Sequence, residues 1–249
     1  MNRYFGKIVH CAFCIACCAL CVVGCAHRPV DEPSTVATKF LRAPGDSTVY
    51  ALAAAGSNDS ILVFLALPYD GADPDTVDIL HARMQRQVFG HPQVGDNVAI
   101  VRNDSDSTIA ERVIVTERLA RRWCYNVYPR LRRKMGEGPL PPRLQQMLEE
   151  TREYSFVIKL GGTMLTMGAH ARQADEQLPV VYPRAKNYGL WAIFNGRLLL
   201  SEVKRDTTGT VTVLGTDTAD FVRLGRDTLV LRFNDGDRRF YRKEEQNNT

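Results

Sequence analysis

The sequence contains little tryptophan and histidine, and it has almost no cysteine outside its first 25 residues. Its 249 residues include two tryptophans, five histidines and seven cysteines, and Cys124 is the single cysteine that follows Cys25. One thiol cannot form an internal disulfide framework, so the folded body must be stabilised by packing alone. Because Cys124 follows Trp123 in a strand-like stretch, we expect a buried, inert thiol rather than a nucleophile.

Motifs that carry catalysis or cofactor binding are also missing. The histidines after Cys25 form no pair with the i, i+4 or His-x-His spacing of zinc ligands. No Gly-x-Ser-x-Gly, Walker or dinucleotide-binding pattern occurs. The sequence therefore predicts a non-enzymatic protein with no cofactor, no metal site and no catalytic residue. A hydrolase of cell-wall or glycan substrates that lacks a signature stays open as an alternative.

Charge and composition set broad limits on the class of protein. Hydrophobic residues make up 45% of the chain, which is typical of a folded globular protein. The 32 basic and 28 acidic residues give a net charge of +4, which is too balanced for a chain devoted to nucleic acid. Basic residues gather between Arg118 and Lys134, interleaved with aromatic ones. Such a stretch either contacts an anionic lipid or glycan or forms a solvated face.

The first 24 residues have the plan of a secretory signal peptide. Arg3 and Lys7 form a short basic region, and Ile8 to Gly24 carry no charged residue. Six of the seven cysteines lie in the first 25 residues, and their Cys-x-x-Cys spacing also fits an iron–sulfur interpretation. The surrounding basic-then-apolar pattern favours cysteine as a small hydrophobic residue of a targeting segment.

The end of this segment resembles the lipobox of bacterial lipoproteins. Val22-Val23-Gly24-Cys25 has its aliphatic–small–small–Cys pattern. The resemblance implies cleavage after Gly24 and acylation of Cys25 with palmitate-like chains, so that an N-terminal lipid binds the membrane. We expect an exported protein anchored in the bacterial cell envelope, at the outer membrane, facing either the periplasm or the medium. An ordinary signal peptide or an uncleaved anchor is the alternative.

Residues 25–46 are predicted to be a flexible tether, and residues 47–117 a small β-rich, barrel-like domain. The tether is rich in proline and charge. In the domain, Asp73-Pro74 predicts the start of a helix with apolar residues at helical spacing, although alternation of Val77 and Ile79 also fits a strand. The predicted strands are Thr48–Ala53, Ile61–Leu67, Asn97–Arg102 and Glu111–Thr116.

Residues 118–246 are predicted to form a second domain of short antiparallel strands. Gly161-Gly162 and Asn195-Gly196 each separate two apolar runs, which is a strong hairpin signal. Pro141–Glu150 predicts a short helix with an apolar side. The pattern favours an up-and-down barrel or a sandwich. The predicted strands are Trp123–Tyr128, Ser155–Leu160, Thr163–Gly168, Gly189–Phe194, Arg197–Ser201, Thr210–Leu214, Phe221–Leu224, Thr228–Phe233 and Arg239–Arg242.

Several segments resemble envelope lipoproteins of Bacteroides-type bacteria that carry a lipocalin-like C-terminal domain. Leu119–Trp123 is similar to their Leu-x-Gly-x-Trp opening, with Arg121 in place of the glycine. Asp217–Phe233 and Phe240–Lys243 look like their closing strands, and Phe89–Ile100 looks like part of their first domain. The resemblance implies a mainly β protein with a lipocalin-like, eight-stranded up-and-down barrel and one or two short helices. It also implies an interior ligand site and supplies no catalytic residues.

The predicted function is therefore a membrane-anchored lipoprotein that binds a small apolar or lipid-like ligand in the barrel. Core filling is the alternative role of the same side chains, since eight strands can be filled without a ligand. The alternative function is an assembly subunit that contacts another envelope protein. The candidate interior residues are Trp123, Tyr125, Trp191, Leu231 and Phe233.

Seven triplets consist of Asp, then Ser or Thr, then an aliphatic residue or Thr. They resemble the O-glycosylation acceptor of exported proteins in Bacteroides-type bacteria. The alternative is that Asp-Ser and Asp-Thr start turns before the next strand. The acceptor hydroxyls would be those of Ser47, Ser60, Thr76, Ser107, Thr207, Thr218 and Thr228.

Overall fold

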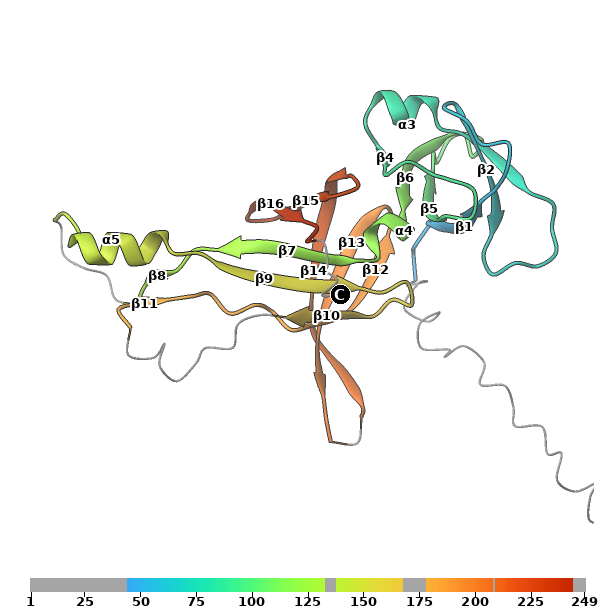
Figure 1. The fold of residues 1–249 in the computed structure, drawn as a ribbon. Coiled ribbons are helices and arrows are strands. Elements are labelled where there is room, and N and C mark those ends of the chain that lie inside the picture. Colours follow the sequence, from blue (N-terminus) through green and yellow to red (C-terminus); the bar gives the residue numbers. More distant parts are fainter. Residues whose placement is uncertain (1–43, 133–137, 168–177, 208, 244–249) are drawn as a thin grey trace, which may run out of the picture. The chain divides into compact units, whose positions relative to one another are not determined.

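The computed structural model describes residues 44–132, 138–167, 178–207 and 209–243 (Figure 1). All of them belong to one unit of the chain, residues 37–249. The predicted signal peptide, Cys25 and residues 26–43 of the predicted tether lie outside the described residues. Strands hold 51% of the described residues and helices 9%, so the predicted mainly β class is confirmed.

The N-terminal part forms a six-stranded sheet in the order β3-β2-β1-β5-β6-β4. The predicted hairpin of β1 and β2 is present, and Asn58 at its turn accepts the backbone N–H groups of Ser60 (2.8 Å) and Ile61 (2.9 Å). This bond pattern suits asparagine in a turn. The strands are β1 (Val49–Ala53), β2 (Ile61–Ala66), β3 (Asp75–Asp78), β4 (Val88–Phe89), β5 (Asn97–Arg102) and β6 (Ala110–Val115).

The helix predicted from Asp73-Pro74 is wrong in its first half. Asp75–Asp78 is a strand instead, because Val77 pairs with Leu62 of β2 and both side chains are buried. The helix, α3, covers only Leu80–Met84. The alternation of Val77 and Ile79, which are both 1% exposed, is the pattern that the sheet uses.

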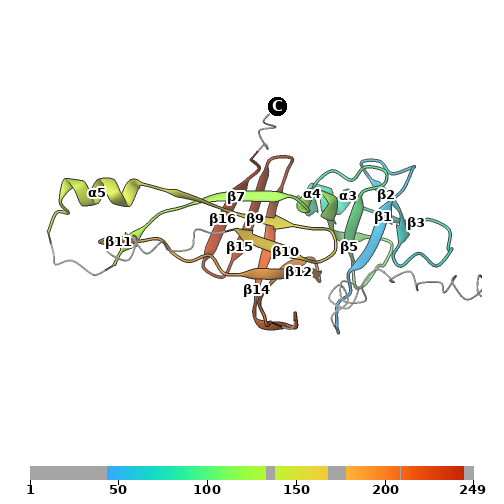
Figure 2. The same cartoon turned by 60° about the horizontal axis from the view of Figure 1, so that its bottom comes forward.

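The C-terminal part forms an eight-stranded antiparallel sheet shaped as a nearly closed barrel (Figures 1 and 2). Each strand pairs with its neighbour in the chain, and the last strand, β16, returns to the first, β7. This is an up-and-down order. The strands are β7 (Arg122–Val127), β9 (Arg152–Ile158), β10 (Met164–Met167), β12 (Tyr188–Phe194), β13 (Arg197–Arg205), β14 (Val211–Leu224), β15 (Thr228–Phe233) and β16 (Gly236–Tyr241).

The two edges of this sheet, β10 and β12, approach each other next to the β9–β10 turn. Thr163 forms an antiparallel bridge with Leu190, and the backbone N–H of Trp191 donates to the carbonyl of Gly162 at 2.9 Å. The Gly161-Gly162 turn that the sequence predicts for the β9–β10 hairpin therefore also contacts β12.

Three further details differ from, or add to, the predicted strands and helices. Residues 211–224 form one 14-residue strand, β14, where two strands were predicted, because Gly215 to Asp217 pair with β13 instead of turning. The predicted helix near Pro141 is confirmed as α5 (Pro142–Glu149). A small sheet of β8 (Arg130–Leu131) and β11 (Val180–Val181) was not predicted. Among the described residues, no helix is long and apolar enough to span a membrane.

Two core clusters occur among the described residues: one lies within the N-terminal sheet, around Leu62, Phe64 and Ile100, and the other is shared by the two large sheets. Phe89 of β4 packs against Phe221 of β14 with ring centroids 5.4 Å apart. The hydroxyl of Tyr50 in β1 donates to the carbonyl of Ile193 at 2.6 Å. The short helix α4 (Thr116–Leu119) joins the sheets, and its Leu119 carbonyl accepts the indole N–H of Trp123 at 3.0 Å. Burial of these apolar groups stabilises both sheets together.

The shared core fills one end of the barrel. The filling side chains come from both sheets and are at most 7% exposed. They include Phe89, Ala99, Ile114, Leu119, Trp123, Ile158, Trp191, Ile193, Leu198, Ala219, Phe221, Leu224, Leu229 and Leu231. Phe156, Met164, Leu200 and Phe240 belong to the same core and also line a cavity further along the strands.

Candidate ligand-binding site

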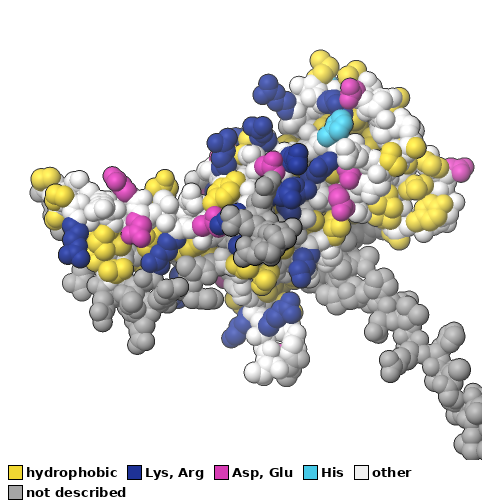
Figure 3. All heavy atoms as spheres, in the orientation of Figure 1, with side chains coloured by type: hydrophobic (Ala, Val, Ile, Leu, Met, Phe, Trp, Pro, Cys, Tyr) yellow, Lys and Arg dark blue, Asp and Glu magenta, His cyan; other side chains and the backbone are white. Residues whose placement is uncertain are grey.

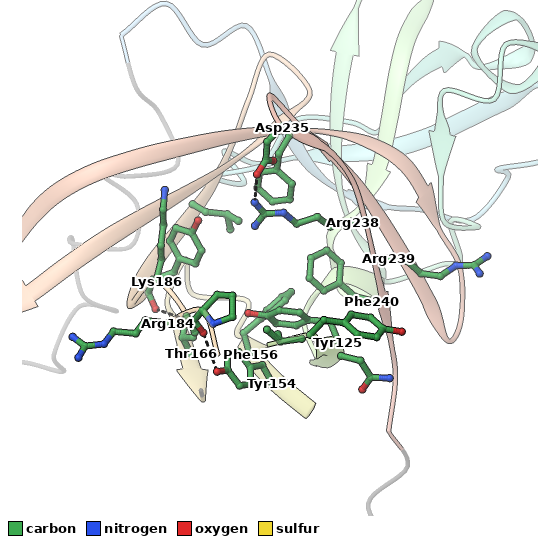
Figure 4. Close-up of a pocket in the computed structure, with 18 of the residues that line it drawn as sticks. Tyr125, Tyr154, Phe156, Thr166, Arg184, Lys186, Asp235, Arg238, Arg239 and Phe240 are labelled. Atoms are coloured by element: carbon green, nitrogen blue, oxygen red, sulfur yellow. Dashed lines mark hydrogen bonds and ion pairs between the residues drawn. The ribbon is translucent and has the colours of Figure 1, made fainter. Parts of the chain in front are cut away.

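A cavity of about 580 Å³ occupies the other end of the barrel (Figure 4). Its volume lies within the roughly 300–1,000 Å³ of typical small-molecule sites. The lining residues come from β7, β9, β10, β12, β13, β15 and β16 and from the segment before β12. Strands far apart in the sequence thus contribute to one site.

Aromatic rings form one wall of the cavity. The ring of Phe240 contacts Phe156 (centroids 5.1 Å apart) and Tyr125 (5.4 Å) in edge-to-face geometry, and Tyr125 contacts Tyr154 at 5.8 Å. Edge-to-face pairs are a favoured aromatic arrangement and hold each ring in place. The hydroxyl of Tyr154 donates to the carbonyl of Pro183 at 2.9 Å. Burial is the main cause that raises the pKa of Tyr125, so its phenol is neutral.

A cation, Arg238, lies on the inward face of β16. Side chains alternate between the two faces of a strand, so Arg238 shares the face of buried Phe240, and its register partner is the buried Leu231. The guanidinium lies 4.5 Å from the ring centroid of Phe233. It also donates to Asp235 at 2.7 Å, and Figure 4 shows this pair side by side at one edge of the cavity, where the Arg238 side chain is 49% exposed.

A second charged group forms the side of the cavity near β12. Lys186 donates to both carboxylate oxygens of Asp217, at 2.8 and 2.6 Å, and the hydroxyl of Tyr188 donates to the same carboxylate. Burial alone would raise the pKa of Asp217, but the hydrogen bonds from Lys186 and Tyr188 lower it overall. Burial and the bond to Asp217 raise the pKa of Tyr188. Asp217 is therefore a carboxylate and Tyr188 a neutral phenol at neutral pH.

The rim of the cavity carries an excess of positive charge. Arg130, Arg184 and Arg239 line it and make no ion pair within the part of the chain that the structure describes. Figure 4 shows Arg184 and Arg239 extending away from the cavity toward solvent. Asp235 is the one acidic residue among the described lining residues. Figure 3 shows Lys and Arg side chains gathered over the barrel on the face that it draws.

The five candidate interior residues fall into two groups. Tyr125 and Phe233 line the cavity. Trp123, Trp191 and Leu231 belong to the filled end, with exposed fractions of 0%, 3% and 0%. Both indole N–H groups there are bonded to backbone carbonyls, that of Trp191 to Lys159 at 2.8 Å.

Sequence reasoning missed most of the cavity. It did not single out the aromatic wall residues Tyr154 and Phe156, nor the polar side chains Tyr188, Lys186 and Arg238. A signal for Arg238 was present, since Arg238 and Phe240 are two residues apart and a strand places both on one face. Of the basic stretch, Arg130 reaches the cavity, whereas residues 133 and 134 lie outside the described residues.

The predicted glycosylation positions are spread over both sheets. Ser47, Thr76, Ser107 and Thr207 are exposed, and Ser60, Thr218 and Thr228 are partly buried. Among the described residues, turn-type bonds occur at three triplets: Asp46 accepts the N–H of Thr48 at 3.0 Å, Asp106 that of Thr108 at 2.9 Å, and Asp206 that of Thr210 at 2.8 Å. At the other four triplets the aspartate pairs with a cation, as in Asp217 with Lys186. The triplets therefore share no single structural role.

Cys124 is buried and forms no disulfide, as predicted. Its backbone register partners in the sheet are Tyr241 of β16 and Ser155 of β9. Burial, followed by the nearby carboxylate of Glu153, raises the pKa of its thiol. Within the described ranges, no three His, Cys, Asp or Glu side chains cluster as a metal site.

A second cavity of about 400 Å³ lies beside β5, β6 and the β12–β13 turn. Its polar groups already bind one another: Arg112 donates to Gln87 at 3.0 Å and to the carbonyl of Gly196 at 2.9 Å, and Asn103 donates to Glu111 at 2.8 Å. Satisfied groups of this kind offer a ligand less than the open aromatic wall of the barrel cavity.

Comparisons with known proteins give no relative on which to base a function. No family model matches the chain, and no curated protein and no solved structure matches it. The geometry of the cavity is therefore the basis for a functional proposal.

Proposed function

We propose that this protein is an exported, lipid-anchored envelope protein that binds a small apolar or lipid-like ligand in its C-terminal barrel, without catalysing a reaction. The cavity of about 580 Å³, with its aromatic wall, carries the proposal. Side chains fill the same barrel at its other end, which shows that a barrel of this size can be packed without leaving a cavity. A cavity with an aromatic wall and a few polar groups is a typical small-molecule site.

Ligand binding is tested with phenylnaphthylamine, a neutral probe that fluoresces in apolar surroundings. We expect saturable binding of one probe per chain. Thr166→Trp should abolish it, because Thr166 lines the cavity and a larger side chain would fill the space. The matched control is Leu165→Trp on the same strand, whose side chain is 53% exposed and lies outside the lining. Equal binding by both variants, or no binding by the parent protein, would contradict the proposal.

The sequence of the first 25 residues supports the proposed anchor. A basic start, an uncharged apolar run and a lipobox-like end lead to Cys25. Mass spectrometry of protein purified from its own host should find cleavage before Cys25 and added acyl chains. Any mass beyond chain and lipid would support O-glycosylation at the Asp-Ser and Asp-Thr triplets. Cys25→Ala should release the protein from the membrane fraction, and retention of this variant there would contradict the anchor.

An assembly subunit is the second candidate function, and one observation favours it. The β13–β14 hairpin projects from the barrel, and its apolar side chains Val211, Val213 and Leu214 are 39%, 43% and 60% exposed (Figure 1). Exposed apolar groups gathered in this way mark protein contacts. Val213→Glu and Leu214→Glu together should remove a cross-linked envelope partner in cells and leave phenylnaphthylamine binding unchanged. The hydrolase alternative has less support, since Asp235 in the cavity is paired with Arg238.

A further inference from the structure

We propose that the ligand of the barrel cavity carries an anionic head group and that Arg238 binds this group. Without the ligand, Arg238 forms an ion pair with Asp235. The inference rests on the proposed ligand-binding function and adds the chemical class of the ligand. An apolar body would lie against Tyr125, Phe156 and Phe240, and the anion would lie at the guanidinium.

The position of Arg238 separates it from the other arginines of the same hairpin. Arg232 and Arg239 lie on the outward face of β15 and β16, whereas Arg238 lies opposite buried Leu231 on the inward face. Its charge also acts on the groups around the cavity: Arg238 is among the causes that lower the pKa values of Tyr125 and Asp217 relative to burial alone. A guanidinium that lies over the Phe233 ring and lines a concave site is suited to bidentate binding of a carboxylate or phosphate.

The partner of Arg238 is easily replaced. Asp235 belongs to the β15–β16 turn, its side chain is 68% exposed, and it is three residues from Arg238 in the chain. Exposed ion pairs of this kind contribute little to stability, because water solvates both charges well when they separate. The Arg238 side chain is itself 49% exposed, so an anion that reaches it can displace the Asp235 carboxylate at small cost.

Lys186, another cation among the lining residues, is not available in the same way. Both carboxylate oxygens of Asp217 accept from Lys186, and Tyr188 donates to the same group. This pair forms a neutral wall beside the ligand. Arg130, Arg184 and Arg239 at the rim add positive potential, which raises the local concentration of anions and their rate of entry.

The experiment uses displacement of phenylnaphthylamine by three ligands with the same chain: dodecanol, dodecanoate and dodecyl phosphate. The two anions should displace the probe at concentrations about tenfold lower than dodecanol, as expected for one charge-assisted contact. Whichever of dodecanoate and dodecyl phosphate displaces the probe at the lower concentration indicates whether the ligand carries a carboxylate or a phosphate. If dodecanol is as effective as both anions, the inference fails although the binding function stands. If the neutral probe itself does not bind, the proposed function fails.

Matched variants assign the effect to Arg238. Arg238→Gln should remove the tenfold preference for the anions over dodecanol, with each ligand compared within the same variant, and Arg238→Lys should keep part of the preference. Asp235→Asn should strengthen anion binding, because it removes the competing carboxylate. The controls are Arg232→Gln and Asp237→Asn, since this pair has the same chemistry (2.7 Å) on the outward face of the same hairpin. An anion preference unchanged in Arg238→Gln, or equally lost in Arg232→Gln, would overturn the assignment.

Discussion

The division of the barrel into a filled and an open end predicts different penalties for the same truncation. Leu231 is fully buried in the filled end, whereas Leu200 is 3% exposed and lines the cavity. Leu→Ala in a packed core destabilises by about 2.7–5.0 kcal/mol, and the lower value applies where little new empty volume remains. Leu231→Ala leaves a closed void, so we expect a loss of about 4 kcal/mol.

For Leu200→Ala the removed methyl groups border the cavity, which Leu200 lines. The new volume joins an existing cavity, so the variant loses the transfer free energy of the side chain but gains no separate void, and we expect about 2 kcal/mol. The difference between the two variants should therefore be about 2 kcal/mol.

Urea unfolding followed by tryptophan fluorescence measures both losses, with unchanged m values as the control that the unfolded states are comparable. Phenylnaphthylamine affinity gives an independent measurement: it should change in Leu200→Ala and stay the same in Leu231→Ala. Equal free-energy losses, or a larger loss for Leu200→Ala, would refute the division of the barrel interior.

Three further predictions concern single groups. Cys124 should react with a thiol reagent only after unfolding, because burial shields the thiol and raises its pKa; rapid reaction of the native protein would show that the site is open. Asp217→Asn should destabilise the protein by about 1–2 kcal/mol at neutral pH. The pKa of Asp217 is lowered in the folded state, so the difference in unfolding free energy between parent and variant should shrink as pH falls below about 4. A difference in unfolding free energy that grew in acid would contradict the assigned ion pair. Gly196→Ala should lower the melting temperature, since Gly196 has φ of +73° and an added Cβ would lie 2.6 Å from the Cδ of Arg112. Gly209→Ala is the control, because Gly209 has φ of +86° but open space around it, so this variant carries the backbone strain without the clash.

Turn chemistry made the hairpins predictable from the sequence. Asn195 and Gly196 have φ of 47° and 73°, and few residue pairs tolerate positive φ at both positions. Gly215-Thr216-Asp217 contains the same kinds of residue but lies inside β14, because Gly215 and Thr216 pair with Glu202 and Ser201 of β13. Tertiary pairing, which a local pattern does not contain, overrides the turn preference there.

Alternation along a strand predicts which face of the sheet a side chain lies on, but not whether it lies at the filled or the open end of the barrel. Trp123 and Tyr125 are two residues apart on the same face of β7, yet Trp123 belongs to the filled end and Tyr125 lines the cavity. The level depends on which side chains other strands place opposite, and here the filling comes partly from Phe89 in the other sheet. Arg238 was missed for a related reason, since a charged residue is expected on the solvent face unless the opposing side chains leave it room.

The shared core at the filled end has a consequence for how a ligand exchanges. Trp123, Leu119 and Phe89 close that end with 0%, 0% and 3% of their surface exposed, so it could open only if both sheets came apart. A ligand must then enter and leave by the same route, apolar end first on the way in and head group first on the way out. Release of the proposed ligand would begin at the guanidinium of Arg238, so its dissociation rate should depend on the charge of that one side chain, whereas salt should slow its association by screening the rim arginines.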